Sequence, residues 1–181
     1  MIRAFLGLDL PADIRSSLAV EQFLLPLPRR VDPPEFHLTL EFLGEQPEPI
    51  LDAVNEGMEA LRSPSFDMAL SGIGHFGGEH PRAVWAGVAP NPALEALQGK
   101  VARICRMAGV RPERRRFHPH VTLGRFTPPD AMETMRLERA IVDRAGFRTP
   151  PFPVREVVLF RSHLGHRGAH YEPLARYPLT G

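Results

Sequence analysis

Phe36-His37-Leu38-Thr39-Leu40-Glu41-Phe42 and Pro119-His120-Val121-Thr122-Leu123-Gly124-Arg125-Phe126 are the two stretches that decide the fold. Both read histidine, aliphatic residue, threonine, leucine, and their histidines lie 83 residues apart. Each stretch has strong β propensity, and side chains alternate between the two faces of a strand. His37 and Thr39 therefore share one face of a predicted strand, and His120 and Thr122 share the equivalent face of another.

The opposite face of each predicted strand is apolar. It carries Leu38, Leu40 and Phe42 in the first stretch and Val121 and Leu123 in the second, so we expect it in the core. An imidazole and a hydroxyl side by side are costly to bury without hydrogen-bond partners. The histidine and threonine faces are therefore expected to line a polar cleft, with one strand from each half of the chain.

Two histidines facing one cleft suit in-line phosphoryl transfer. That reaction needs a base for the nucleophile on one side of the phosphorus and an acid for the leaving oxygen on the other, and histidine can do both near neutral pH. The threonine hydroxyls can donate hydrogen bonds to the non-bridging phosphate oxygens. A single His-x-Thr on a strand usually marks only a polar outer face, so the prediction depends on finding the motif twice.

The rest of the sequence favours an α+β fold. We expect paired strands at 66–89 and 153–176 to form antiparallel ribbons, which argues against a purely alternating α/β sheet. The full set of expected elements follows, with Asn91 capping the third helix and Gly109 ending it: strands at 2–9, 36–43 (stopping at Gly44), 66–76, 82–89, 117–126, 153–161 and 169–176, and helices at 11–25, 49–61, 91–109 and 130–145.

Composition sets limits on the function. Net charge is +1, with 22 basic and 21 acidic residues, so any RNA contact must be local rather than spread over a long strand. The single cysteine, Cys105, falls in a predicted helix and indicates a packed thiol in a reducing compartment. The apolar run 2–10 is short and carries Arg3 and Asp9, unlike a signal peptide or membrane span. We therefore expect a cytoplasmic protein with no membrane partner.

The paired motifs and their surroundings resemble the RNA 2′,3′-cyclic phosphodiesterases, long labelled 2′-5′ RNA ligases, within the two-histidine phosphoesterase superfamily. The similarity covers nearly the whole chain. It is carried by these segments: Arg3 to Pro11, His37 to Gly44, Val84 to Val88, Pro119 to Arg125, Leu159 to Ser162 and Tyr171 to Leu174.

The resemblance implies one bilobal domain over 1–181, with two pseudo-symmetric lobes, each an antiparallel sheet flanked by helices. It implies hydrolysis of an RNA terminal 2′,3′-cyclic phosphate to a 2′-phosphomonoester, without metal or cofactor, by a monomer whose partner is the RNA 3′ end. His37 is the implied proton donor and His120 the implied proton acceptor, while Thr39 and Thr122 orient the phosphate. The residues alone would also allow the two histidine roles to be exchanged.

Four further residues are candidates for substrate contacts. Relatives often carry arginine at the position of Arg125, although strand alternation places it opposite His120 unless the strand bends; a structural ion pair is the alternative. His118 shares the predicted face of His120 and could add positive charge that fades as pH rises, or be an exposed loop histidine. Phe76 and Tyr171 could stack on a base, or belong to the core.

Other functions remain open on the sequence. A metal-dependent phosphoesterase is suggested by eight histidines and by His118-x-His120, but there is one cysteine and no clustered acidic set. His163, His166 and His170 lie in a glycine-rich loop and are expected to be solvated. A non-catalytic RNA-end-binding protein, a 2′-5′ RNA ligase, or a hydrolase of another small cyclic phosphate would use the same residues.

Overall fold

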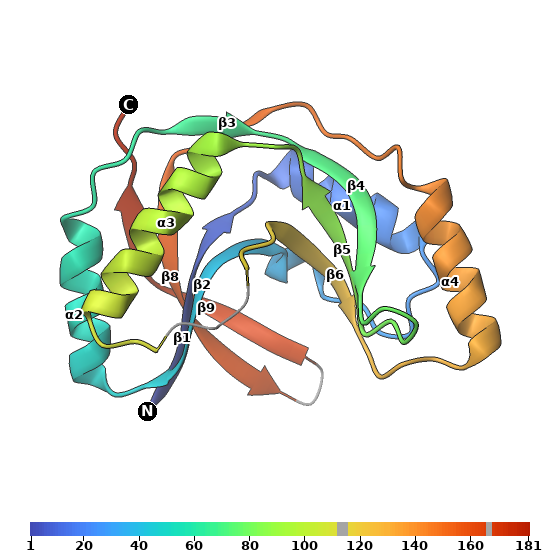
Figure 1. The fold of residues 1–181 in the computed structure, drawn as a ribbon, viewed down its shortest axis with the longest axis horizontal. Coiled ribbons are helices and arrows are strands. Elements are labelled where there is room, and N and C mark those ends of the chain that lie inside the picture. The colour runs from blue at the N-terminus through green and yellow to red at the C-terminus, as the bar shows by residue number, and fades with distance from the viewer. Residues whose placement is uncertain (112–115, 166–167) are drawn as a thin grey trace.

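The structure is a computed structural model that describes residues 1–111, 116–165 and 168–181 (Figure 1). Its elements follow the predicted order of strands and helices. They are β1 (Ile2–Asp9), α1 (Ala12–Leu24), the 3-10 turn η1 (Pro33–Glu35), β2 (His37–Gln46), α2 (Glu48–Glu59), β3 (Phe66–Met68), β4 (Leu70–Phe76), β5 (Ala83–Val88), α3 (Pro92–Met107), β6 (His120–Arg125), α4 (Ala131–Asp143), β7 (Phe152–Val154), β8 (Glu156–Gly165) and β9 (Gly168–Pro178).

Seven of the strands form one antiparallel sheet in the order β4-β5-β6-β2-β1-β8-β9, and β3 pairs with β7 separately. The helices divide between the two halves of this sheet. α1 packs on β6 and α4 on β4, whereas α3 packs on β2 and α2 packs on α3 and β9. In Figure 1 the first pair of helices lies on one side of the molecule and the second pair on the other. The α+β class and the bilobal arrangement predicted from the sequence are confirmed.

The two motif strands meet in the middle of the sheet. β2 and β6 pair through Leu38 and Val121, the residues that directly follow His37 and His120. Equivalent residues of two antiparallel strands face each other only at a local two-fold axis, so this contact places the pseudo-symmetry axis between the motifs. Continuing the antiparallel register sets each motif histidine across from the other motif's threonine.

Each motif strand carries a β-bulge at the same place. In β6, Thr122 pairs with Trp85 and Gly124 with Val84, so Leu123 is an extra residue. In β2, Thr39 and Glu41 pair with consecutive residues of β1, so Leu40 is the extra residue there. An extra residue shifts the alternation of side chains by one position. Beyond each bulge, the face that a side chain occupies is therefore reversed.

The bulges change two predictions made from strict alternation. Phe42 was expected in the core, but it is 40% exposed and its ring lies 6.1 Å from that of Phe5, beside His37. Arg125, at the equivalent position in β6, lines the same cavity as His37 and Thr122. The condition that the strand must bend for Arg125 to reach the histidines is met by the bulge at Leu123.

Several element boundaries were predicted wrongly, among them the strand expected at 153–161, which divides into β7 and β8 of different sheets. β2 does not stop at Gly44 but continues to Gln46, because Gly44 adopts a φ of 71° that lets the pairing with β1 resume. The run 66–76 divides into β3 and β4, which belong to different sheets. β6 begins at His120 rather than at 117, so the strand alternation used to orient His118 does not apply to it.

A buried glutamine on α1 forms hydrogen bonds that link this helix to the bulge of β6. Gln22 on α1 is 5% exposed, and its Nε2 donates to the carbonyls of Val31 (2.6 Å) and Leu123 (2.7 Å). On the other side of the pseudo-axis, Gln98 on α3 donates to the carbonyl of Leu40 at 3.4 Å. The carbonyl of each bulge residue thus accepts a hydrogen bond from a glutamine side chain on the helix that packs on its strand.

Replacing Gln22 by leucine is expected to lower the free energy of unfolding by about 1–3 kcal/mol, because a buried carbonyl loses its donor while side-chain volume is kept. Urea denaturation of the variant and the wild type measures this difference. Gln98→Leu is the matched control, and its longer bonds at a half-buried site should make its effect smaller. Equal stability of wild type and Gln22→Leu would contradict this assignment.

Candidate active site

His37 is held by its own backbone at the start of β2. Its Nδ1 lies 2.8 Å from the carbonyl of Glu35, and its Nε2 lies 3.1 Å from Oγ1 of Thr39. A carbonyl can only accept, so Nδ1 carries the proton in the neutral ring and Nε2 accepts from the threonine hydroxyl. The atom able to exchange a proton with a ligand is therefore Nε2.

His120 repeats this arrangement in β6. Its Nδ1 lies 2.7 Å from the carbonyl of His118, two residues earlier, as Glu35 is two residues before His37. The same reasoning leaves Nε2 of His120 as the exchangeable atom. The two motifs therefore share not only their sequence but also the hydrogen bond that fixes the tautomer of each ring.

The turn before His37 is held in place from two directions. Arg15 on α1 donates to the carbonyls of Pro33, Pro34 and Phe36 and forms an ion pair of 2.5 Å with Asp9. This guanidinium therefore fixes the backbone that carries the Glu35 carbonyl.

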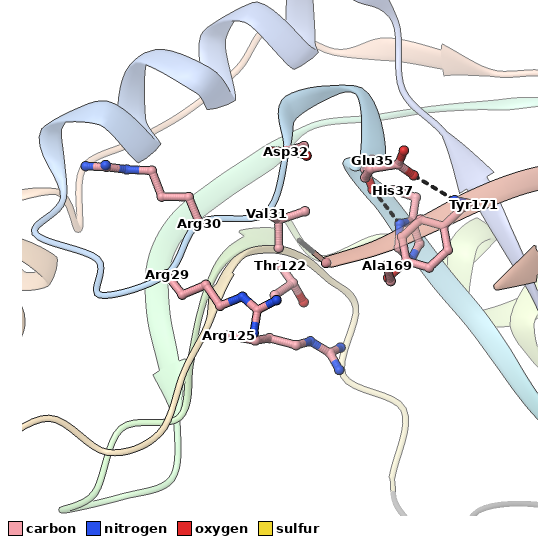
Figure 2. A pocket seen from close by; sticks show the side chains of 11 residues that line it. Arg29, Arg30, Val31, Asp32, Glu35, His37, Thr122, Arg125, Ala169 and Tyr171 are labelled. Atoms are coloured by element: carbon pink, nitrogen blue, oxygen red, sulfur yellow. Dashed lines mark hydrogen bonds between the residues drawn. The ribbon is translucent and has the colours of Figure 1, made fainter. Parts of the chain in front are cut away.

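The Glu35 side chain fixes the same turn to the end of the β8–β9 hairpin. Its two carboxylate oxygens accept from Nδ1 of His170 (2.7 Å) and from the backbone N–H of Tyr171 (2.9 Å), the second of which is drawn in Figure 2. These contacts position His37 before any substrate binds.

Aromatic rings pack around each histidine. The His37 ring centroid lies 4.6 Å from those of Phe5 and Tyr171. The His120 centroid lies 4.9 Å from that of Phe76 and 6.2 Å from that of Trp85. Both imidazoles are thus set in largely apolar walls, which strengthens electrostatic interactions at the exposed ring edge.

Both imidazoles titrate below the usual range. Burial lowers the pKa of His37 to about 4, with Arg125 and His120 adding to the effect and the Glu35 carbonyl opposing it. Burial also lowers the pKa of His120, with His118 and Arg125 contributing. The two rings are close enough for the charge of His120 to influence His37. Without a bound anion, both rings are neutral at pH 7.

A cavity of about 210 Å³ opens beside His37 (Figure 2). His37, Thr122, Arg125 and Tyr171 line it, so four of the predicted site residues are brought together. The remaining lining residues come from the α1–η1 connection, η1 and the start of β9: Arg29, Arg30, Val31, Asp32, Glu35, Gly168 and Ala169. The cavity therefore combines guanidinium groups, an imidazole and a hydroxyl, which together suit a phosphate.

The other predicted contacts lie near the histidines. Phe76 is 39% exposed and packs against His120. His118 is exposed, and its ring centroid lies 4.8 Å from that of Trp85 and 6.1 Å from that of His120. Trp85 packs closely over Gly74.

His163 and His170 are exposed, as expected of solvated histidines, but they lie on β8 and β9 rather than in a loop. His163 lies 2.7 Å from a Glu172 carboxylate oxygen, and His170 is paired with Glu35. Each exposed ring therefore has an acidic partner, which the sequence did not indicate. His166 lies outside the described residues.

Within residues 1–111, 116–165 and 168–181, no three histidine, cysteine, aspartate or glutamate side chains gather in a metal-binding arrangement. Cys105 is buried in α3, where burial raises its pKa to about 12, so the thiol is packed as predicted. No helix in the described part of the chain has the length and apolar character to cross a membrane.

Two residues of this site were not found from the sequence. Arg29 lies in the proline-rich passage 26–34, which was read only as a connection, and Glu35 is one acidic residue among many. Gly124 was the one available signal for the bulge that brings Arg125 into the cavity, because a glycine inside a strand often marks a bulge.

An antiparallel two-lobed sheet with a His-x-Thr motif from each half at its centre defines a two-histidine phosphoesterase fold. The family model of the 2′-5′ RNA ligase superfamily matches residues 12–166. The chain belongs to this superfamily.

Individual relatives extend the likeness. The RNA 2′,3′-cyclic phosphodiesterase of Escherichia coli K12 is 31% identical over 182 residues, which cover 98% of this chain and 97% of that protein. That of Geobacillus stearothermophilus is 33% identical over 160 residues, 87% of this chain but 49% of that protein, so the chain spans about half of that relative's length. The crystal structure of E. coli LigT complexed with 3′-AMP matches with a TM-score of 0.81 and 28% identity, covering 99% of each chain.

Proposed function

We propose that the protein hydrolyses the 2′,3′-cyclic phosphate at an RNA 3′ end to a 2′-phosphomonoester, using His37 and His120 without a metal ion. The observation that carries this is the pseudo-symmetric pairing at Leu38 and Val121, which sets the two motifs across one axis. The phosphodiesterase activity named for the E. coli and G. stearothermophilus relatives supports the choice of reaction. The structure of LigT with 3′-AMP supports a nucleotide as the ligand class.

In the proposed reaction, Nε2 of neutral His120 takes a proton from water as the water oxygen attacks phosphorus. The bond from phosphorus to the ribose 3′ oxygen breaks, and Nε2 of protonated His37 gives its proton to that oxygen. The ring is opened, the 2′-phosphate stays on the ribose, and the proton on His120 must return to solvent or to His37 before the next cycle. Each histidine acts through the nitrogen that its backbone hydrogen bond leaves exchangeable.

Thr39, Thr122 and Arg125 are proposed to hold the phosphate. The Thr39 hydroxyl lies 3.1 Å from Nε2 of His37, and we propose that a bound phosphate oxygen takes over this donor. Thr122 and Arg125 line the cavity from the other motif. Donors placed in advance around a developing charge stabilise the transition state without reorganising when the reaction occurs.

The low pKa of His37 has a direct consequence for its role as acid. The His37 ring is mostly neutral at pH 7, because burial lowers its pKa to about 4. A cyclic phosphate brings a negative charge next to the ring, and a nearby opposite charge favours the protonated imidazole. The substrate is therefore proposed to supply the charge that allows His37 to hold the proton it later donates.

This coupling predicts different pH profiles for kcat/KM and kcat. The pH profile of kcat/KM reports the free enzyme, in which the pKa values of both histidines are lowered. We therefore expect kcat/KM to fall with rising pH already below the ordinary histidine pKa of about 6.5. The pH profile of kcat reports the bound complex, in which the phosphate raises both pKa values, so the decline of kcat should lie at higher pH. Steady-state rates from pH 4 to 9 measure both; declines at the same pH would contradict the proposal.

The activity is tested with an oligonucleotide that ends in a 2′,3′-cyclic phosphate, incubated in excess EDTA. We expect full turnover and a product that carries only a 2′-phosphate, identified by chromatography against both isomers. A 3′-phosphate product would mean that the 2′ oxygen leaves instead. Binding without turnover would favour an RNA-end-binding protein, and activity abolished by EDTA and restored by one metal would favour a metal-dependent enzyme.

The setting of the reaction is also a proposal. A buried thiol with no second cysteine fits a reducing compartment, so we place the protein in the cytoplasm. One chain supplies both motifs, so we propose that residues 1–181 act as a single two-lobed unit and that a monomer is active. Light scattering of the active enzyme at assay concentration tests the last point.

A further inference from the structure

The cavity beside His37 contains a guanidinium that the proposed reaction does not use. Arg29 lies in the connection between α1 and η1 and lines the cavity together with Arg125. Figure 2 shows the Arg29 side chain extending toward Arg125, whereas Arg30 extends the other way, with its guanidinium donating to the carbonyl of Leu25 at 3.3 Å. Of these two neighbours, Arg29 alone directs its charge toward the site.

The backbone of Arg29 is held against the strand that carries His120. A side-chain carbon on Gly124 would lie 2.6 Å from the Arg29 carbonyl oxygen, so the connection rests directly on β6. The next residue but one, Val31, donates from its N–H to the carbonyl of Leu123 at 2.9 Å. The side-chain amide of Gln22 donates to the carbonyls of both Val31 and Leu123. Arg29 is therefore fixed relative to the bulge that also places Arg125.

The two guanidinium groups that face the cavity form no ion pair with either of the described carboxylates that line it. Among the described residues, neither Arg29 nor Arg125 has an ion pair or a side-chain hydrogen bond. Two carboxylates line the cavity, Asp32 and Glu35, but the oxygens of Glu35 already accept from His170 and the Tyr171 backbone. Guanidinium groups gathered in a small cavity repel one another, and a phosphate is the anion that their planar donors fit best.

The two arginines are placed for different anions. Arg125 is close enough to lower the pKa of both His37 and His120, so it lies beside the phosphate that reacts. Arg29 enters the cavity from the α1–η1 connection, whereas Arg125 enters it from β6, so the two guanidinium groups come from different walls. In an RNA end, the next anionic group beyond the cyclic phosphate is the phosphate on the 5′ side of the terminal nucleotide.

We propose that Arg29 binds this 5′-side phosphate, so that the site selects nucleotides with a second phosphate over a nucleoside 2′,3′-cyclic phosphate with a free 5′ hydroxyl. The inference rests on the proposed function and adds the substrate feature that determines specificity. Loss of one charge-assisted hydrogen-bonded contact with phosphate should change kcat/KM about 10- to 100-fold.

Three substrates and four proteins test the role of Arg29. The substrates are cytidine 2′,3′-cyclic phosphate, its 5′-phosphorylated form, and a cytidine dinucleotide that ends in the cyclic phosphate; the last two separate a terminal phosphate from a bridging one. The proteins are the wild type, Arg29→Gln, Arg29→Lys, and Arg136→Gln, which removes the same charge from the exposed face of α4. Thermal unfolding of each variant confirms that it is folded.

We expect wild type and Arg136→Gln to prefer the two substrates with a second phosphate, and Arg29→Gln to lose that preference while keeping its rate on cytidine 2′,3′-cyclic phosphate. Arg29→Lys should recover part of it, because it keeps the charge but not the two-pronged contact. Equal wild-type kcat/KM on all three substrates, or an equal loss on all three in Arg29→Gln, overturns the inference and leaves the proposed function standing. No wild-type turnover of any of them overturns both.

Discussion

Replacing His120 by alanine is expected to lower kcat about 10²–10⁴-fold on an RNA 2′,3′-cyclic phosphate, because the attacking water loses its base. His37→Ala should cost a similar factor, because the 3′ oxygen must then leave without a proton. The effects should not multiply: a base and an acid that act in one step behave as a unit, so the double variant should be about as slow as the slower single variant.

Single-turnover rates of the three variants measure these effects apart from product release. His80→Ala is the matched control, since His80 is an exposed histidine in the turn between β4 and β5, and its rate should equal that of the wild type. Losses that multiply in the double variant would show that the two histidines act in separate steps. That outcome is incompatible with one phosphorus between them.

Thr122→Val is expected to lower kcat about 10²-fold, the effect of removing one well-placed donor to a developing charge, roughly 3 kcal/mol. Valine keeps the shape of threonine on a strand, so the cavity wall should be retained. KM should change little, because the donor acts mainly on the transition state. A larger KM with unchanged kcat would instead assign Thr122 to ground-state binding.

Thr39→Val is expected to differ from Thr122→Val in its effect on the pH profile. The Thr39 hydroxyl also donates to Nε2 of His37, and removing that donor frees the nitrogen to take up a proton. We therefore expect Thr39→Val to lower kcat as Thr122→Val does and also to move the decline of kcat/KM to higher pH. The pH profile of Thr122→Val should stay where the wild-type profile lies.

Much of this site follows from a repeat that is visible in the sequence. The two His-x-Thr stretches predicted two strands, a shared polar face and a cleft with one motif on each side, and Leu38 pairs with Val121 as such a repeat requires. These predictions depend on local β propensity and on alternation over only three residues. Over that distance alternation is reliable, because the bulges come after the threonines.

Alternation of side chains gave a wrong prediction beyond the bulge. Phe42 was assigned to the core because alternation was extended across Leu40, where the strand holds an extra residue. Whether a strand bulges depends on its partner strand and on the side-chain amide that donates to the bulge carbonyl, here Gln98 for Leu40 and Gln22 for Leu123. These are contacts between distant parts of the chain, which a single sequence does not display.

Arg29 was missed for a similar reason. Nothing in the passage 26–34 distinguishes a solvated arginine from one directed into a cavity. The difference comes from the close approach of the Arg29 backbone to Gly124, a contact between residues far apart in the sequence. Likewise, the carboxylate of Glu35 acquires its role only because the β8–β9 hairpin returns to η1.

The central claim is that His37 protonates the leaving 3′ oxygen while His120 activates water on the same phosphorus. A substrate with sulfur in place of that oxygen tests it most directly, since a thiolate, with a pKa near that of cysteine at about 8.5, leaves without needing a proton. On this substrate His37→Ala should recover most of the wild-type rate, while His120→Ala should stay as slow as on the oxygen substrate. Recovery of His120→Ala in place of His37→Ala, or of neither variant, would contradict the account.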